Sequence, residues 1–575
     1  MIIERRQVPA VAALHGKVPP LLERIYAARQ ITDAEELELK LSRLLPPDTL
    51  KGMPEASHLL YQLLQRQGRV LIVSDFDADG ATSCALVVRA LGKMGFQHVD
   101  YIVPDRFAYG YGLSPEIAEL ALERRPDLVI TVDNGISSLE GVERLKAEGI
   151  AVLITDHHLP GDQLPDADAI VNPNQPDCGF ASKALAGVGV AFYVMLGLRA
   201  QLRQEGWFDR AGIQEPNLAE LLDLVALGTV ADLVPLDRNN RILVNEGLRR
   251  MRQGRACPGI YALLSVAGRA THSLTASDMG FAVAPRLNAA GRLEDMSIGI
   301  ACLLTDDPAS AERHARELDR LNKERRRIED EMREQADQAL QEMLGELEQR
   351  ELPAALCLYD AGWHPGVVGI LASRLKEQLH RPVFIFAKAD EQELKGSARS
   401  IEGLHIRDLL ADIATRYPGV ITRFGGHAMA AGLSLPPEQL PAFQDALQRC
   451  AESVLKSDSL QRRLLTDGEL PIEAHSLESA RILRDAGPWG QGFPEPVFDG
   501  RFRVIQQRLV GEKHLKMVLS ADGGVTLIDA IAFNVDRGMW PDASIREVSV
   551  VYRLDVNEFR GVSQAQLLVL HLEPV

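Results

Sequence analysis

The stretch RVLIVSDFDADGATSC (69–84) contains the change of pattern that decides the fold. An apolar, largely β-branched run ends at Asp75, and two more aspartates follow before a helical stretch, GATSCALVVRALGKMG (80–95). An apolar run without polar alternation is typical of a parallel strand that is buried on both faces. The segment therefore predicts a buried strand, an acidic turn and a helix, which is the repeating unit of an α/β domain.

The same pattern recurs over the next hundred residues. Four more apolar runs end in polar or turn residues, namely VDYIVPD (99–105), DLVITVD (127–133), IAVLITD (150–156) and DAIVN (168–172). Helical stretches separate them, such as SLEGVERLKAEG (138–149). Strands that alternate with helices predict a parallel sheet with right-handed crossovers.

The rest of the chain changes character several times. Because 575 residues exceed what one core supports, we expect several domains. A charged stretch after residue 308 predicts a long linking helix, and five β-rich runs near the end suit a small barrel such as an OB-fold, a common single-strand-binding module. The expected parts are an N-terminal arm (1–50), the parallel-sheet domain (51–305), the linking helix (306–351), a second α/β domain (352–458) and the β-barrel domain (459–575).

Composition sets limits but does not identify a partner. The six cysteines form no CxxC pair, which argues against a thiolate zinc site. The net charge of −17 argues against nucleic acid only weakly, because basic residues can gather in one groove. No signal-peptide core and no run of about 18 apolar residues is present, so we expect a cytoplasmic chain without a membrane span.

Acidic and histidine residues gather where the predicted strands end. Asp75, Asp77 and Asp79 follow the first strand, Asp133 ends the third, and the triplet 156–158 (Asp-His-His) ends the fourth. The carboxyl ends of parallel strands share one edge of the sheet, so these side chains should converge. A single aspartate at a strand end is most often a turn former or a helix cap, but three such strand ends together are not explained by capping.

A cluster of carboxylates needs a cation. Acids within about 4–6 Å of one another repel and raise one another's pKa values. Oxygen ligands with one or two imidazoles suit Mn²⁺ or Mg²⁺. Two such ions about 3.5–4 Å apart are an arrangement used for phosphoryl transfer, in which they activate water and stabilise the leaving oxygen.

Three of these motifs resemble those of the DHH phosphoesterases. They are SDFDADG (74–80), VDNG (132–135) and TDHH (155–158), and GTVADLVPL (228–236) resembles the fourth motif of that family. The resemblance implies a two-metal centre with the ligands Asp75, Asp77, Asp79, Asp133, His157 and Asp232. Which of the first three acids touch metal stays open.

The resemblance also implies roles for the remaining polar groups of these motifs. His158 would polarise the scissile phosphate, or exchange roles with His157, and Asp156 would orient a histidine. We count His158, Asp156 and Asp133 as the candidate catalytic residues.

Substrate-binding candidates come from five other segments. For PRLNAAGRL (285–293) the alternative is a structural turn, and for the GGH of GGHAMAAG (425–432) it is a glycine turn followed by a helix. GGHAMAAG resembles the DHHA1 domain that accompanies DHH domains and grips the substrate. PDRFAYGYGL (104–113) places an arginine at a strand end, where a surface salt bridge is as good an explanation. The candidate phosphate contacts are Arg106, Arg286, Asn288, Arg374, Ser397, Arg399 and His427.

The whole series of motifs is most similar to the RecJ family of single-strand-specific exonucleases. The chain length, the motifs between the two α/β domains and the β-rich tail after GPWGQGFPEPVF (487–498) support this resemblance. It implies 5′→3′ hydrolysis of single-stranded DNA to mononucleotides, in repair and recombination beside a helicase and a single-strand-binding protein. The alternatives are a DHH phosphoesterase for short oligonucleotides or cyclic dinucleotides, a non-catalytic single-strand-binding scaffold, and an unrelated metal phosphatase.

Overall fold

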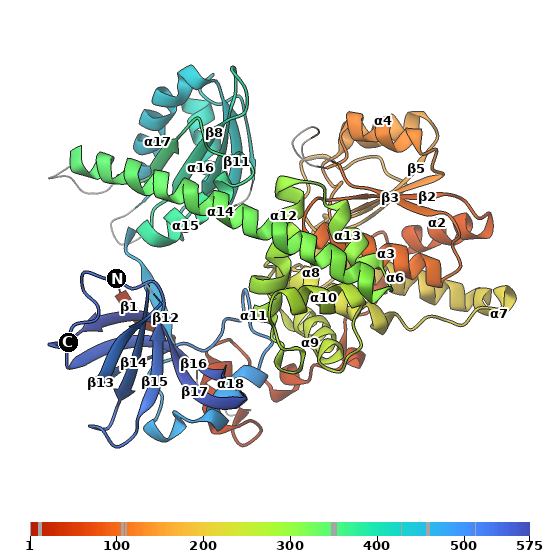
Figure 1. Cartoon of the computed structure of the whole chain (residues 1–575). Helices are drawn as coiled ribbons and strands as arrows, with labels where there is room; N and C mark the ends of the chain where they lie inside the picture. The colour runs from red at the N-terminus through yellow and green to blue at the C-terminus, as the bar shows by residue number, and fades with distance from the viewer. Residues whose placement is uncertain are drawn as a thin grey trace. The chain divides into compact units, whose positions relative to one another are not determined.

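The computed structural model describes residues 2–9, 14–104, 109, 112–346, 353–426, 428–455, 460–511, 513–559 and 561–575, without side chains at 336–346 and 559. The chain divides into two compact units (Figure 1). One contains residues 1–4 and 320–464, and the other contains residues 5–319 and 465–575. Each unit is described by itself below.

The larger unit contains the predicted five-stranded parallel sheet. Its strands are β2 (Val70–Ser74), β3 (Val99–Ile102), β4 (Leu128–Val132), β5 (Ala151–Thr155) and β6 (Ala169–Val171). Every residue of β2 and β4 is buried, as the uninterrupted apolar runs predicted. The spatial order is β3-β2-β4-β5-β6, all parallel, so the direction of winding reverses between β2 and β4. In doubly wound sheets such a switch point is where ligands bind.

Helices cover both faces of this sheet (Figure 1). On one face, α4 (Pro115–Glu123) and α5 (Leu139–Ala147) bury Ile117, Val142 and Leu145 against apolar residues of β2, β4 and β5. On the other face lie α2 (Met53–Gln65), α3 (Ala78–Lys93) and α6 (Gly187–Gln204), and α8 (Leu222–Ala231) packs on α3 and α6. The α/β fold predicted from the sequence is confirmed.

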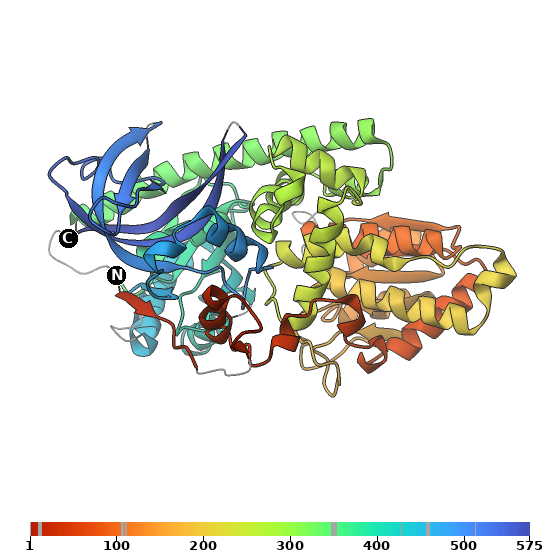
Figure 2. The same cartoon turned by 90° about the horizontal axis from the view of Figure 1, so that it is seen from below.

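A helical region follows the sheet. Its helices are α7 (Trp207–Ala211), α9 (Arg238–Arg252), α10 (Pro258–Val266), α11 (Ala276–Asp278), α12 (Ala284–Leu293) and α13 (Ser297–Leu304). A π-helical turn, Met279–Val283, joins α11 to α12. The predicted linking helix is α14 (Pro308–Glu346), which passes from the larger unit into the smaller one and is visible in Figures 1 and 2.

The smaller unit contains a mixed sheet in the order β10-β11-β9-β8-β7. Its strands are β7 (Leu356–Tyr359), β8 (Val383–Lys388), β9 (Leu394–Arg399), β10 (Arg423–Gly426) and β11 (Ala430–Leu435). Its helices are α15 (Val368–Leu379), α16 (Ile406–Arg416) and α17 (Leu440–Val454). Phe384, Phe386 and Phe443 meet edge to face in its core.

The C-terminal part of the larger unit is a closed five-stranded barrel. Its order is β13-β14-β15-β17-β16, and the strands are β13 (Phe498–Val510), β14 (His514–Ser520), β15 (Ile528–Ala532), β16 (Glu547–Phe559) and β17 (Val562–Pro574). Helix α18 (Leu477–Asp485) precedes them. The five β-rich runs of the sequence correspond to these five strands, so the predicted barrel is confirmed.

An N-terminal segment packs against the polypeptide that leads into this barrel. The guanidinium of Arg29, which follows α1 (Pro20–Ala27), lies 2.8 Å from Asp467, and both side chains are 1% exposed. Tyr26 stacks on Trp489 and Phe493 and donates a hydrogen bond to the carbonyl of Ala486 (2.9 Å). Figure 2 shows this first segment in dark red beside the blue C-terminal part.

Strand β1 (Ile2–Arg5) pairs with β12 (Arg463–Thr466). Among the described residues, seven 3₁₀ turns complete the regular structure: Ala34–Leu37, Leu41–Arg43, Pro47–Thr49, Leu218–Leu221, Thr271–Ser273, Pro437–Gln439 and Ile472–Ala474. The described helices include none that is long and apolar enough to span a membrane.

Candidate metal centre

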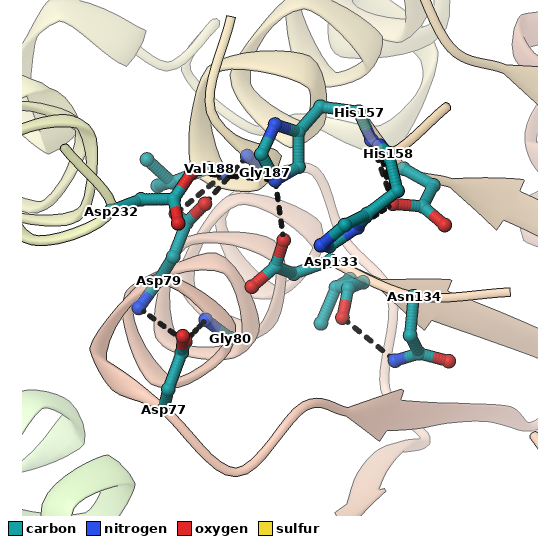
Figure 3. A network of polar contacts seen from close by, with 12 residues as sticks. Asp77, Asp79, Gly80, Asp133, Asn134, His157, His158, Gly187, Val188 and Asp232 are labelled. Carbon is teal, nitrogen blue, oxygen red and sulfur yellow. Dashed lines mark hydrogen bonds and ion pairs between the residues drawn. The ribbon is translucent and has the colours of Figure 1, made fainter. Parts of the chain in front are cut away.

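The predicted acidic cluster forms at the carboxyl edge of the parallel sheet (Figure 3). Asp75 follows β2, Asp133 follows β4, and Asp156 follows β5. The first two lie at the end of the neighbouring strands where the direction of winding reverses. Asp133 has a backbone φ of 62°, a left-handed conformation that Asp tolerates better than most non-glycine residues.

The two acids at the start of α3 have different partners. Asp77 caps α3, since its Oδ1 accepts hydrogen bonds from the backbone N–H groups of Asp79 (2.8 Å) and Gly80 (3.0 Å). Asp79 is 1% exposed, and its two oxygens accept from the N–H groups of Gly187 (2.6 Å) and Val188 (2.9 Å) at the start of α6. The positive end of the α6 dipole therefore helps to hold this buried carboxylate.

The histidine pair joins the acids to the end of α8. His157 Nε2 lies 3.2 Å from Asp133 Oδ1 and 3.4 Å from Asp232 Oδ2. Asp232 is the C-cap of α8, so a fourth element reaches the centre, as the GTVADLVPL motif implied. Figure 3 shows the His157 ring above Asp133, with Asp232 and Asp79 to its left.

Asp156 holds the second histidine in place. Its Oδ1 lies 2.7 Å from His158 Nδ1 and accepts from the N–H groups of His157 (2.7 Å) and His158 (3.1 Å), while its Oδ2 accepts from Ile136 N–H (2.9 Å). Burial is the largest single effect on His158 and lowers its pKa, but the hydrogen bond to Asp156 and the negative charges of Asp156, Asp75 and Asp77 together outweigh it, so the pKa is raised. With Nδ1 engaged in this way, Nε2 is the ring nitrogen directed to a ligand or a substrate.

The donor set fits hard divalent cations. Three groups of side chains bring ligand atoms within 4.8 Å of one another: Asp75, Asp77 and Asp133; Asp79, His157 and Asp232; and Asp133, His157 and His158. Burial and the neighbouring carboxylates raise the pKa of Asp79 to about 7 and those of Asp133 and Asp232 well above the usual range. A cation would remove this repulsion, and oxygen with imidazole donors suits Mn²⁺ or Mg²⁺.

At two glycines beside the cluster, the carboxylates lie too close to leave room for a side chain. A Cβ atom added to Gly187 would lie 2.6 Å from Asp133 Oδ1, and one added to Gly228 would lie 2.8 Å from Asp79 Oδ1. Asn134 Nδ2 donates to the carbonyls of Val73 (3.1 Å) and Val132 (2.9 Å), which ties the ends of β2 and β4 together. Sequence reasoning gave none of these three residues a role, although VDNG and GTVADLVPL contain two of them.

Three family models match consecutive parts of the chain. They are the DHH family N-terminal domain (residues 69–229), the DHHA1 domain (353–453) and the RecJ OB domain (466–571). Over 573 residues the chain is 53% identical to the single-stranded-DNA-specific exonuclease RecJ of Escherichia coli, covering 100% of this chain and 99% of that one. The chain belongs to the RecJ family.

Solved structures of the RecJ family agree with this assignment. RecJ of Thermus thermophilus in complex with Mn²⁺ matches with a TM-score of 0.81 and 31% identity, over 100% of this chain and 80% of that chain. The complex of the same protein with Mg²⁺ matches with a TM-score of 0.75 and 29% identity, over 78% of that chain. Metal-bound relatives with this fold agree with the Mn²⁺ or Mg²⁺ expected from the donor set.

Two predicted phosphate contacts of this RecJ-family chain lie on α12 and are engaged within the larger unit. Asn288 Oδ1 accepts a hydrogen bond from Ala78 N–H (2.7 Å) at the start of α3, next to the acidic turn. The guanidinium of Arg286 is 2.8 Å from Asp319. The segment is a helix and not the structural turn weighed as its alternative. These contacts position α12 against the centre, and phosphate binding by either residue stays a prediction.

The other described candidates lie in the smaller unit. Arg399 Nε and Nη1 donate to the hydroxyls of Ser373 (3.1 Å) and Ser397 (3.0 Å). Gly369 on α15 lies against this pair, because an added Cβ would be 3.0 Å from both Arg399 Nη2 and Ser397 Oγ. Arg374 instead forms an ion pair with Glu329.

Arg106 and His427 lie outside the described residues. Gly425 and Gly426 end β10, and its partner strand β11 begins at Ala430, so the alternative of a glycine turn before a helix is wrong.

Proposed function

We propose that this chain is a metal-dependent exonuclease that hydrolyses single-stranded DNA 5′→3′ to mononucleotides. The observation that carries the proposal is the donor cluster at the sheet switch point, where Asp133 and His157 each belong to two of the three ligand groups. Shared donors of this kind suit two neighbouring cations. Relatives at 50% identity or more over nearly the whole chain are named single-stranded-DNA-specific exonucleases, which favours this substrate over cyclic or short oligonucleotides.

The residues of the metal centre have different roles in the proposed reaction. We propose that Asp75, Asp77, Asp79, Asp133, His157 and Asp232 hold the cations, which when bound activate water and offset charge on the transferring phosphoryl group. His158 lies at the same centre with Nδ1 fixed by Asp156, so its Nε2 can contact a substrate oxygen. Asp156 is a positioning residue because its contacts are to His158 and to backbone N–H groups.

Arg399 is the best described candidate for a substrate phosphate contact. Its hydrogen bonds go to two serine hydroxyls and one backbone carbonyl, and it forms no ion pair with any described residue. Burial lowers its pKa, and no nearby carboxylate offsets that effect. A partly buried guanidinium with neutral partners is suited to an anion.

The proposed function also concerns DNA binding beyond the metal centre, the cellular location and the partner proteins. The RecJ OB domain supports contact with the single strand beyond the metal centre. We further propose that the chain acts in the cytoplasm in DNA repair and recombination, beside a helicase and a single-strand-binding protein. We also propose the domain limits expected from the sequence, which limited proteolysis with mass spectrometry tests.

The test is a nuclease assay on end-labelled DNA with Mn²⁺ or Mg²⁺. We expect wild type to shorten single strands from the 5′ end to mononucleotides and to leave blunt duplex intact. Asp133→Asn and His157→Ala should lose this activity, whereas Asp162→Asn, an exposed change four residues beyond the histidine pair, should keep it. Hydrolysis of dinucleotides without degradation of long strands would refute the proposal, as would activity in Asp133→Asn.

A further inference from the structure

A separate pocket lies in the larger unit, between the N-terminal segment, α9 and the turn after α18. Its volume is about 390 Å³, which is within the usual range for small-molecule sites. Its walls are partly apolar, with Leu37, Leu39 and the ring of Tyr26. The metal centre supplies none of its lining residues.

Arg241 determines which kind of ligand this pocket favours. Its side chain belongs to α9 and is 4% exposed, and its Nε has no hydrogen-bond partner among the described residues. The guanidinium lies 4.2 Å from the centroid of the Phe493 ring and forms no ion pair with a described residue. A buried charge without a counter-ion is costly, so a site of this kind favours an anion that enters it.

The acids near Arg241 are engaged elsewhere. Glu36 accepts hydrogen bonds from Thr32 and from the backbone of Asp33 in a capping box. Asp237 caps α9 and accepts from the hydroxyl of Ser182 at 2.5 Å. Neither carboxylate forms an ion pair with the guanidinium, although the negative charges of both act to raise the pKa of Arg241, which burial lowers.

The acids of the pocket wall are also paired. Glu38 lies 3.7 Å from Lys40 and 3.5 Å from Arg43, and Asp485 lies 3.1 Å from Arg484. Lys40, itself a lining residue, adds a second positive group. Asn245 also lines the pocket, and it lies one turn after Arg241 on the same face of α9.

We propose that this pocket binds the phosphate group of a nucleotide-sized phosphate ester through Arg241 and Lys40. The apolar wall and the Tyr26 ring would pack against the base, and the carboxylates of Glu38 and Asp485 would accept hydrogen bonds from its amino groups. The site goes beyond the proposed exonuclease function, because it is built from other residues and needs no metal. A free phosphate ion shares the same recognition chemistry, and the experiment separates the two sources.

The test counts bound deoxyadenosine monophosphate on the full chain in Mg²⁺ by equilibrium dialysis. Nucleotide bound at the metal centre contributes equally to every variant. Arg241→Met should bind one equivalent fewer than wild type, or bind that equivalent at least about tenfold more weakly. The matched control, Arg249→Met, changes an exposed arginine two turns further along the same helix and should keep the full number. Equal binding by wild type and Arg241→Met would overturn the proposal.

A second variant tests the same idea without removing the arginine. Asn245→Asp places a carboxylate one turn from the guanidinium, so it should raise the melting temperature of the nucleotide-free protein and remove the same equivalent. If Asn245→Asp lowers the melting temperature and leaves nucleotide binding unchanged, the idea that the Arg241 guanidinium has no counter-ion would be contradicted. Deoxyadenosine should not compete, and its competition would overturn phosphate recognition. Competition by inorganic phosphate at equal concentration would identify the free ion as the occupant, whereas weaker competition would identify the ester.

Discussion

Gly187→Ala is the most direct test of how closely α6 fits the metal centre. The added Cβ would lie 2.6 Å from Asp133 Oδ1, 2.7 Å from its Cβ and 2.8 Å from its Cγ. Asp133 is 1% exposed, so it has little free space into which to move. Either its carboxylate shifts, or the start of α6 moves and weakens the hydrogen bond from Gly187 N–H to Asp79.

A shift of about 1 Å in a catalytic group costs roughly 100-fold in rate, which corresponds to about 2.7 kcal/mol. Overpacking a core costs about 1–3 kcal/mol in the free energy of unfolding. We therefore expect Gly187→Ala to fold but to lose about 100-fold in kcat/KM on single-stranded DNA, with a higher Mn²⁺ concentration for half-maximal activity.

The control is Gly92→Ala on α3, where the added Cβ meets no atom within 4 Å. It should keep full activity and gain stability from the better helix propensity of alanine. Melting curves and metal titrations of both variants give the comparison. Activity of Gly187→Ala within threefold of wild type, at an unchanged metal requirement, would contradict a tight fit of α6 against Asp133.

Three further changes test other parts of the molecule. Asp156→Asn should lower activity or metal affinity by about 10–100-fold, because the contact that orients His158 weakens, and activity at saturating Mn²⁺ separates the two effects. Asp467→Ala leaves the buried guanidinium of Arg29 unpaired and should cost about 3–5 kcal/mol in chemical denaturation, whereas the double change with Arg29→Met should cost much less. Arg399→Met should raise KM for DNA and leave the metal requirement unchanged, and a changed metal requirement would count against its assignment as a phosphate contact.

The sequence predicted the sheet and the position of its acids because both depend on local pattern. Uninterrupted apolar runs indicated buried parallel strands, and the rule that such strands share one carboxyl edge brought Asp75, Asp133 and Asp156 together in advance. The shared edge also explains why Asp75 and Asp133, which are 58 residues apart, meet in the structure.

The partners of long side chains were not predictable in this way. Phosphate contact by Arg286 and Arg374 stays a prediction, but the sequence did not indicate their ion pairs with Asp319 and Glu329, which lie in a charged helix with many similar residues. Nothing in the local pattern distinguishes the acid that is used from its neighbours. Gly187 was likewise missed, because its importance comes from the close approach of α6 to Asp133.

The contact between Arg29 and Asp467 joins residues 438 positions apart, and it has a consequence for the order of folding. During synthesis the N-terminal segment leaves the ribosome early, yet its buried partner is among the last parts of the chain to be made. The aromatic ring of Tyr26 likewise cannot stack on Trp489 and Phe493 until those residues have been synthesised. The parallel sheet can form from neighbouring segments in the meantime, so the first residues of the chain should be among the last to reach their native positions.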